Sequence, residues 1–346
     1  MDGTKLIAFS LFRRSRAALF SRSAALLLGA ACVLPAQARD YGPEHPGVPA
    51  FIEQMQREHG FSAEHVQALL DQAEHQDNII KAISRPAERV KPWHEYRAIF
   101  ITDQRIERGL AFWAEHADTL ARAEKEYGVE PEVILAIIGV ETFYGRNMGS
   151  YRVLDALATL GFDYPPRADF FRKQLMSYMV LTREQQIDPL ELKGSYAGAM
   201  GYGQFIPSSY QAYAVDFDGD GKVDIWNNPV DAIGSVANYL AVHRWRKGEP
   251  IALRIPVELS VQLESFVTRG LKPNTPLATL VQAGVKPVPG VDLNWNVGVM
   301  RFDQGSKVEY RLGYHNFFVI TRYNRSQNYA MSAFELAEQI AARIKD

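Results

Sequence analysis

The hydrophobic pattern of this chain is helical from about residue 51 to residue 246, because apolar side chains recur every three or four positions. The clearest segments are 51–58, 62–76, 103–126 and 131–142. Ser62 suits the N-cap of the second segment, and Glu64 suits its first turn, where the helix dipole favours an acid. Residues 40–50 are rich in Pro and Gly and predict an extended lead-in.

The pattern changes to alternation after residue 250. Alternating runs at 251–259, 297–302, 308–312 and 317–323 predict strands that are joined by turns containing Pro and Gly. Helical spacing returns at 332–344, and we expect this segment to pack back on the helical part. The sequence therefore predicts an α+β protein that is mainly α. It has an N-terminal helical region at 39–130, a helical core at 131–250, a small β-rich insert at 251–318 and a return to the core at 319–346.

Composition agrees with a folded globular protein. The chain has 346 residues, of which 47% are hydrophobic and 23% are charged, and these values exclude disordered and fibrous classes. Residues 1–38 hold five basic side chains and one acidic side chain, so their removal takes the formal net charge from −2 to −6. An acidic protein is a poor binder of nucleic acid. We therefore expect no nucleic-acid partner.

Residues 1–38 have the pattern of a signal peptide. Basic side chains, among them Arg13 and Arg14, precede an apolar stretch at 24–34 and a small-residue site at 36–38. A membrane helix is the alternative, but the stretch is shorter than the roughly 20 residues that span a bilayer. We expect cleavage after Ala38 and export to the periplasm by the general secretory route, with twin-arginine export as an alternative. Lipidation at Cys32, the single cysteine, is another alternative and would associate the chain with the outer membrane.

Glu141 is the first candidate for chemistry. Pro131 suits the first turn of a helix, and residues 133–140 contain no polar side chain, so this helix should be buried on all sides. Glu141 ends the run near the negative end of the helix dipole, and both the burial and the dipole raise the pKa of its carboxyl group. A carboxyl group that is protonated near neutral pH can act as a general acid. The burial pattern alone leaves a second interpretation, in which Glu141 marks where the helix reaches the surface.

Four sequence blocks resemble those of a known enzyme family. Residues 141–146 read Glu-Thr-Phe-Tyr-Gly-Arg and resemble the Glu-Ser/Thr-x-x-Gly motif that carries the catalytic acid in lysozyme-like lytic transglycosylases. Residues 199–210, 231–240 and 317–330 are similar to later blocks of the membrane-bound lytic transglycosylase B family. The four blocks occur in order over roughly residues 50 to 344, which makes the resemblance specific. It implies a lysozyme-like helical core.

The resemblance also implies a reaction that uses one carboxyl group. Ordinary glycosidases use two, but the motif around Glu141 offers no second candidate. Glu141 would protonate the β-1,4 bond between N-acetylmuramic acid and N-acetylglucosamine, with the N-acetyl oxygen of the substrate as nucleophile. As a carboxylate it would then take the C6 hydroxyl proton and leave a 1,6-anhydromuramoyl end without consuming water. The expected partner is the glycan strand of peptidoglycan with its peptide stems, in cell-wall turnover or remodelling.

Further site residues follow from positions that match the family. Ser195 falls where the family places a hydroxyl that orients the catalytic carboxyl group, although an ordinary turn serine is the alternative. Arg167 falls on a position suited to the carboxylates of the peptide stems, but Pro166 stands where the family often has a second Arg. The other candidates offer amide or aromatic groups suited to sugar rings and are Tyr96, Gln204, Tyr239, Tyr323, Asn324 and Tyr329. Taken alone, a tyrosine such as Tyr96, Tyr239 or Tyr323 is more often a core residue than a substrate contact.

An acidic loop at 216–231 predicts a calcium site. Residues 216–224 match the first nine positions of an EF-hand loop, with Gly at the sixth position. The twelfth position is Asn227 instead of a bidentate Glu, and the resemblance makes Asp231 the closing carboxylate, one residue later than expected. The candidate ligands are Asp216, Asp218, Asp220, Lys222, Asp224 and Asp231. The alternative is a metal-free loop of Asx-turns, although clustered carboxylates repel one another unless a cation neutralises them.

Three functions remain open at this point. The first is a lytic transglycosylase with structural calcium and no organic cofactor, acting as a monomer. The second is a lysozyme-type hydrolase that uses water, and the mass of the product separates the two because an anhydro end is one water lighter. The third is a catalytically silent protein that binds peptidoglycan or serves as a calcium-stabilised scaffold.

Overall fold

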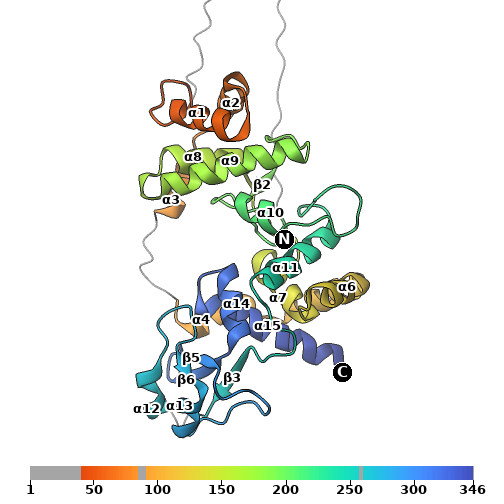
Figure 1. Ribbon diagram of the computed structural model, residues 1–346, viewed down its shortest axis with the longest axis vertical. Helices are drawn as coiled ribbons and strands as arrows, with labels where there is room; N and C mark the ends of the chain where they lie inside the picture. The colour runs from red at the N-terminus through yellow and green to blue at the C-terminus, as the bar shows by residue number, and fades with distance from the viewer. Residues whose placement is uncertain (1–39, 85–90, 257–259, 346) are drawn as a thin grey trace, which may run out of the picture. The chain divides into compact units, whose positions relative to one another are not determined.

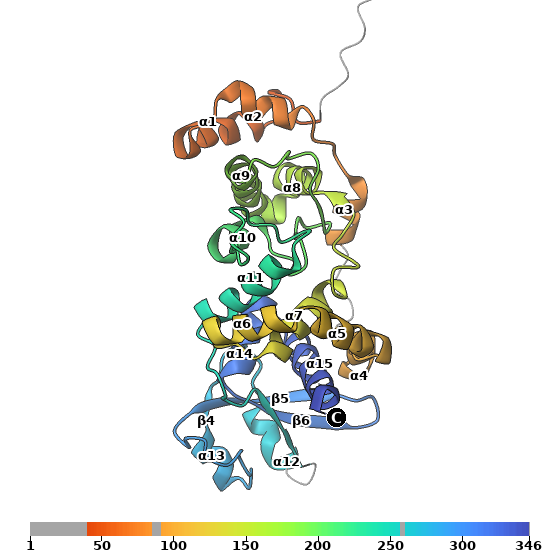
Figure 2. The same ribbon diagram turned by 90° about the vertical axis from the view of Figure 1, so that its right-hand side faces the viewer.

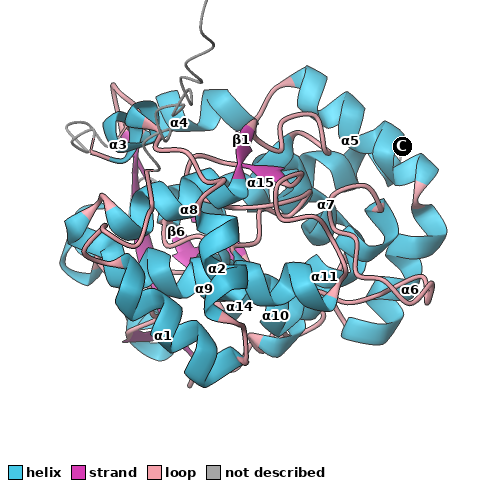
Figure 3. Cartoon of the chain, turned by 90° about the horizontal axis from the view of Figure 1, so that it is seen from above, coloured by secondary structure: helices cyan, strands magenta, loops and turns pink. Residues whose placement is uncertain are grey.

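The computed structural model describes residues 40–84, 91–256 and 260–345, and they belong to the unit Arg39–Asp346 (Figure 1). The predicted signal peptide with Cys32 lies outside the described residues. Helices dominate this unit and the strands are few and short (Figure 3), so the predicted mainly helical α+β class is confirmed. Among the residues described, no helix has both the length and the apolar character needed to cross a bilayer.

The helices in the first part of the chain differ in extent from those predicted, because the first is longer than the predicted 51–58 and the second is shorter than the predicted 62–76. They are α1 (Val48–His59), α2 (Ala63–Leu70), α3 (Asp77–Ile83), α4 (Trp93–Phe100), α5 (Asp103–Glu115) and α6 (Ala117–Tyr127). Ser62 caps α2 as predicted, since its Oγ accepts a hydrogen bond from the His65 amide at 3.1 Å. The prediction of one helix over 103–126 was wrong, because the backbone leaves the helical region at His116, with φ at −120°. Residues 40–47 form turns rather than an extended lead-in, and the buried Tyr41 hydroxyl donates to Asp163 at 2.9 Å.

The first of the central helices is α7 (Pro131–Thr142), which lies beside α6 in Figures 1 and 2. The others are α8 (Val153–Phe162), α9 (Ala168–Glu184), α10 (Pro207–Tyr213) and α11 (Pro229–Val242), with the 3₁₀ helix η1 (Pro165–Arg167). The short strands β1 (Tyr151–Arg152) and β2 (Lys193–Gly194) pair antiparallel. Helices α5, α6, α11 and the C-terminal α15 (Gln327–Lys345) pack against α7. Every residue of α7 is therefore buried except Glu132 and Glu141.

The β-rich part forms one four-stranded sheet in the order β3-β6-β5-β4, in which all neighbouring strands pair antiparallel. Its elements are β3 (Ala252–Ile255), α12 (Ser260–Leu263), η3 (Glu264–Phe266), β4 (Thr275–Pro276), α13 (Leu277–Gln282), β5 (Asn296–Asp303) and β6 (Val308–Gly313). The hairpin β5–β6 has Gly298 opposite Gly313 and Asp303 opposite Val308. A separate apolar cluster, which includes Leu263, Leu277 and Leu312, holds the sheet on α12 and α13 (Figure 2).

Three of the four strands predicted in this region are present, and the fourth prediction was wrong. Residues 317–323 belong to α14 (His315–Tyr323) instead of a strand. Asn316 to Thr321 are all buried, because α11, α15 and β6 pack against this segment. A short segment that is buried on every side shows neither the helical repeat nor the alternation of a strand clearly. The hydrophobic pattern therefore could not distinguish a strand from a helix here.

Candidate active site

Glu141 projects from the last turn of α7. The hydroxyl of the neighbouring Thr142 bonds the carbonyls of Ile138 (3.2 Å) and Tyr202 (2.9 Å) and accepts from the Gly145 amide (3.0 Å). Phe143 then ends the helix in the left-handed region, with φ at 54°. These bonds tie the end of α7 to the loop that contains Tyr202, and so they fix the direction in which Glu141 leaves the helix.

The pKa of the Glu141 carboxyl group lies near neutral pH. Its side chain is half-buried, and burial raises its pKa from 4.5 to about 7. The Tyr329 hydroxyl donates to Glu141 Oε1 at 2.6 Å and acts in the opposite direction. In the ranges that the structure describes, no Lys or Arg forms an ion pair with Glu141 and no other carboxylate shifts its pKa. The group can therefore be protonated at neutral pH and can also ionise there.

Three predicted tyrosines lie around Glu141. Tyr96 comes from α4, Tyr323 from the end of α14 and Tyr329 from the first turn of α15. Burial first, and then the charge of Glu141, raises the pKa of each phenol. The Tyr323 hydroxyl donates to the Gly203 carbonyl at 2.5 Å. Residues far apart in the sequence thus supply phenols to one carboxyl group.

A wall of aromatic rings continues from Tyr323. Tyr239 meets Tyr323 edge-on at 4.6 Å between ring centroids, and its hydroxyl donates to the Arg322 carbonyl at 2.7 Å. His243 stacks on Tyr239 at 4.1 Å and 20°. We call Phe205, Tyr239, His243 and Tyr323 the aromatic wall. His243 was not predicted, although its position four residues after Tyr239 on a predicted helix was a usable signal.

The loop after β2 carries Ser195 and Gln204. Ser195 Oγ accepts hydrogen bonds from the amides of Ala197 (3.3 Å) and Ala199 (3.1 Å), and neither bond uses its hydroxyl proton. The Gln204 amide donates to the carbonyls of Met148 (3.2 Å) and Gly201 (3.0 Å), so its oxygen is not used in these bonds. Gln204 has φ at 51°, a left-handed conformation that is uncommon for a side chain of this kind.

Gly203 has to be glycine for Tyr323 to reach this loop. A Cβ atom at position 203 would lie 2.7 Å from the Tyr323 hydroxyl and 3.1 Å from Val236. The first distance is far inside van der Waals contact, and the phenol ring is too rigid to move its end cheaply. The glycine therefore positions the aromatic wall next to Glu141.

The acidic loop brings three carboxylates together. Oxygens of Asp216, Asp218 and Asp231 lie within 4.8 Å of one another. Asp216 accepts from the amides of residues 219, 220 and 221 at 2.7 to 3.2 Å. The buried Asp231 accepts from those of residues 217, 218 and 224 at 2.7 to 3.4 Å. Asp220 and Asp224, also predicted, instead accept from local amides, as at Lys222 and Trp226.

Comparison with known proteins decides the family. A family model, transglycosylase SLT domain, matches residues 44–338. The chain belongs to this family. It is 43% identical over 311 residues to membrane-bound lytic murein transglycosylase B of Escherichia coli (strain K12), and the match covers 87% of this chain and 84% of that relative.

Solved structures of transglycosylases share the fold. The soluble lytic transglycosylase SltB1 from Pseudomonas aeruginosa is 55% identical, with a TM-score of 0.82 and coverage of 87% of this chain and 100% of that one. The Escherichia coli lytic transglycosylase Slt35 in complex with calcium is 42% identical, with a TM-score of 0.79 and coverage of 88% and 96%. The predicted family and the predicted enzyme class, a lytic transglycosylase, are confirmed.

Two residues predicted from the resemblance to the transglycosylase family make no contact with the Glu141 carboxyl group. Arg167 is exposed at the start of α9, and its guanidinium lies over the rings of Phe170 (4.2 Å) and Phe171 (5.2 Å). Asn324 is exposed and ends α14 directly after Tyr323. Among the described residues, neither side chain has an interaction that joins it to Glu141. Both remain predicted binding residues.

Proposed function

We propose that this transglycosylase cleaves the β-1,4 bond between N-acetylmuramic acid and N-acetylglucosamine in peptidoglycan without water, and that Glu141 alone serves as acid and then base. The observation that carries the proposal is the state of Glu141, a carboxyl group with a pKa of about 7 and no second carboxylate acting on it among the described residues. Such a group can give a proton and later accept one at the same pH. Cell-wall turnover or remodelling is the process that this reaction serves.

In the first step, protonated Glu141 donates its proton to the glycosidic oxygen while the C1–O4 bond breaks. The N-acetyl carbonyl oxygen of the muramic acid attacks C1 and forms a cyclic intermediate, so the substrate supplies the nucleophile that a second carboxylate would otherwise supply. In the second step, the Glu141 carboxylate takes the proton of the C6 hydroxyl, O6 bonds to C1 and the N-acetyl oxygen leaves. The proton on Glu141 is restored and no water is consumed.

Neighbouring groups suit both steps. Tyr329 holds Glu141 Oε1 in place by its 2.6 Å hydrogen bond and stabilises the carboxylate that forms after the first step. The hydroxyl proton of Ser195, unused by its two backbone bonds, is available to a carboxylate or a substrate oxygen. Gln204 presents a carbonyl oxygen that can accept from an acetamido N–H, while Tyr96, Tyr239 and Tyr323 offer ring faces to the sugars. Asn324 and Arg167 would bind outside this group.

Glu141→Gln tests the assignment on purified sacculi. The variant keeps the size and the hydrogen-bond acceptor of the side chain but has no proton to give, so we expect cleavage to fall by at least about a thousandfold. Glu132→Gln is the matched control, because it changes the other glutamate of α7. Mass spectrometry of the wild-type products should show ends one water lighter than reducing ends. Reducing ends would establish the hydrolase instead, and full activity in Glu141→Gln would refute the assignment.

We also propose that calcium binds Asp216, Asp218 and Asp231 and has a structural role. The fit rests on the convergence of their oxygens within 4.8 Å, because three carboxylates so close repel one another unless a cation is present. The Asp231 pKa is raised, first by burial and further by the charge of Asp218, although its amide partners act in the opposite direction. An ion there would join the loop to the start of α11.

Chelation tests the calcium proposal. Calcium at a hundred times its Kd stabilises a folded chain by about 2.7 kcal/mol, so we expect a chelator to lower the melting temperature by several degrees. Asp218→Asn should abolish that difference. Asp118→Asn, which changes an exposed aspartate of α6, should preserve it. A wild-type melting temperature that is the same with chelator and with calcium would contradict the proposal.

We propose that the chain is exported to the periplasm, cleaved after Ala38 and monomeric. The intact mass of the protein isolated from cells separates this form from one lipidated at Cys32, and sedimentation measures its oligomeric state.

A further inference from the structure

A groove lined by basic side chains runs between the β-rich part and the helices of the aromatic wall. It consists of three adjoining pockets with volumes of about 720, 190 and 320 Å³. The first two share Lys272 and Arg322, and the last two share Pro273 and His315. We call it the basic groove, and its cationic residues are Arg244, Arg246, Lys272, Arg322 and Arg325.

The charge of the basic groove is unbalanced. No Asp or Glu is among the described residues that line the three pockets. Lys272, Arg322 and Arg325 form no ion pair with another described residue, whereas Arg246 pairs with Glu249 at 3.3 Å. The chain without its first 38 residues carries a formal charge of −6. The groove is therefore positively charged in a chain whose net charge is negative. Concentrated positive charge in a concave surface attracts anions.

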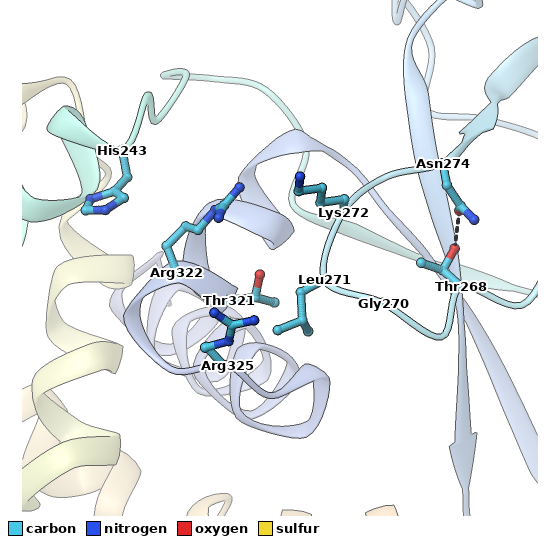
Figure 4. Close-up of a pocket in the computed structure, with 9 residues that line it drawn as sticks. All are labelled: His243, Thr268, Gly270, Leu271, Lys272, Asn274, Thr321, Arg322 and Arg325. Atoms are coloured by element: carbon cyan, nitrogen blue, oxygen red, sulfur yellow. Dashed lines mark hydrogen bonds between the residues drawn. The ribbon is translucent and has the colours of Figure 1, made fainter. Parts of the chain in front are cut away.

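The cations approach the first pocket from two sides (Figure 4). Arg322 lies in the last turn of α14 and Arg325 lies just after this helix, while Lys272 comes from the segment between η3 and β4. Asn274 accepts from the Thr268 hydroxyl at 2.6 Å. This hydrogen bond holds the ends of the 268–274 segment together and so shapes the side that carries Lys272.

The groove and the catalytic carboxyl group share the aromatic wall. Arg322 directly precedes Tyr323, whose pKa responds to the charge of Glu141. His243 lines the first two pockets and stacks on Tyr239, which in turn packs against Tyr323. A ligand in the groove therefore lies on the wall that would contact the sugars.

We propose that the basic groove binds the carboxylates of the peptide stems of peptidoglycan. The inference rests on the proposed function, and its chemistry is that of the substrate. Every N-acetylmuramic acid can carry a stem on its lactyl group, so a stem is attached to one of the two sugars at the cleaved bond. Stem peptides are flexible chains with several carboxylates, and guanidinium and ammonium groups bind carboxylates through charge-assisted hydrogen bonds. This site is separate from Arg167, which lies at the start of α9.

The test compares two substrates that differ only in their stems. One is glycan strands with stems, and the other is the same strands after enzymatic removal of the stems. Lys272→Gln/Arg325→Gln removes two charges from the groove without changing Arg322, which adjoins Tyr323. Lys286→Gln/Lys307→Gln is the matched control, since both lysines are exposed on the β-rich part and neither lines the groove. We expect the groove variant to lower the ratio of kcat/KM for stemmed over stripped strands about tenfold, and the control to retain the ratio.

Each other outcome overturns the inference or redirects it in a defined way. An unchanged ratio in the groove variant overturns it, even if both rates fall together. Binding of the wild-type chain to vesicles of anionic phospholipid, lost in the variant without a change in the ratio, assigns the groove to a membrane surface and overturns it. If the wild-type chain cleaves neither substrate, the proposed function fails. In that case, calorimetric titration with the free stem peptide tests the inference separately. Binding by the wild-type chain that Lys272→Gln/Arg325→Gln loses supports the inference, and absence of binding overturns it.

Discussion

Glu141→Gln should stabilise the fold at alkaline pH even as it abolishes catalysis. The pKa of Glu141 is about 7 in the folded chain and has a usual value of 4.5. Between these values the folded chain holds a proton that the unfolded chain has lost, so stability falls as the pH rises through this window. At 1.36 kcal/mol per pKa unit, the wild-type chain loses about 1 kcal/mol by pH 5 and about 3 kcal/mol by pH 8. These are upper limits, because part of the side chain contacts solvent.

A glutamine at position 141 does not titrate, and its carbonyl can still accept the Tyr329 hydrogen bond. Urea unfolding should therefore show that Glu141→Gln has a higher free energy of unfolding than the wild type, and that this difference is about 2 kcal/mol larger at pH 8 than at pH 5. The contributions of other titratable groups to stability cancel, because both chains contain these groups and are compared at the same pH. A gain of equal size at both pH values, or a loss at pH 8, would refute the assignment of a buried, proton-holding carboxyl group.

Two other substitutions examine the supports of Glu141. Tyr329→Phe removes the hydrogen bond that lowers the Glu141 pKa, so the alkaline limb of the kcat profile should move to higher pH; an unmoved limb would show that the bond does not tune the acid. Gly203→Ala should lower stability by about 1 to 3 kcal/mol, because its Cβ would lie 2.7 Å from the Tyr323 hydroxyl. Adding Tyr323→Phe removes that hydroxyl and should recover part of the loss in thermal unfolding, and strictly additive losses would contradict the clash.

The sequence could single out Glu141 as a candidate because the relevant signals are local. Eight apolar residues precede it, its own motif follows it, and the helix from Pro131 to Thr142 forms over the predicted range. Ser62 as an N-cap was similarly local. Residues 317–323 show the opposite case, because burial on every side removes the periodicity that separates a strand from a helix.

Contacts between distant segments could not be derived from the pattern. The wall on which Tyr323 lies needs Gly203 to lack a side chain, and neither spacing nor composition shows that the two positions meet. The same holds for the basic groove, because Lys272 and Arg322 come from separate elements that only the fold brings together. In the acidic loop, spacing suggested four aspartates and the resemblance added Asp231, but which oxygens converge depends on how the loop turns onto α11.

A single carboxyl group can serve two opposite roles only if neither protonation state is strongly favoured. An enzyme with two carboxylates can separate the roles, since the charge of one raises the pKa of the other. Here burial raises the Glu141 pKa and the Tyr329 hydroxyl opposes that rise, so the pKa lies near neutrality without a second acid among the described residues. The phenols at the site lose their own protons only at high pH, because burial and the charge of Glu141 both raise their pKa. In the proposed mechanism they would therefore remain donors through both steps, and Glu141 would be the group whose proton moves.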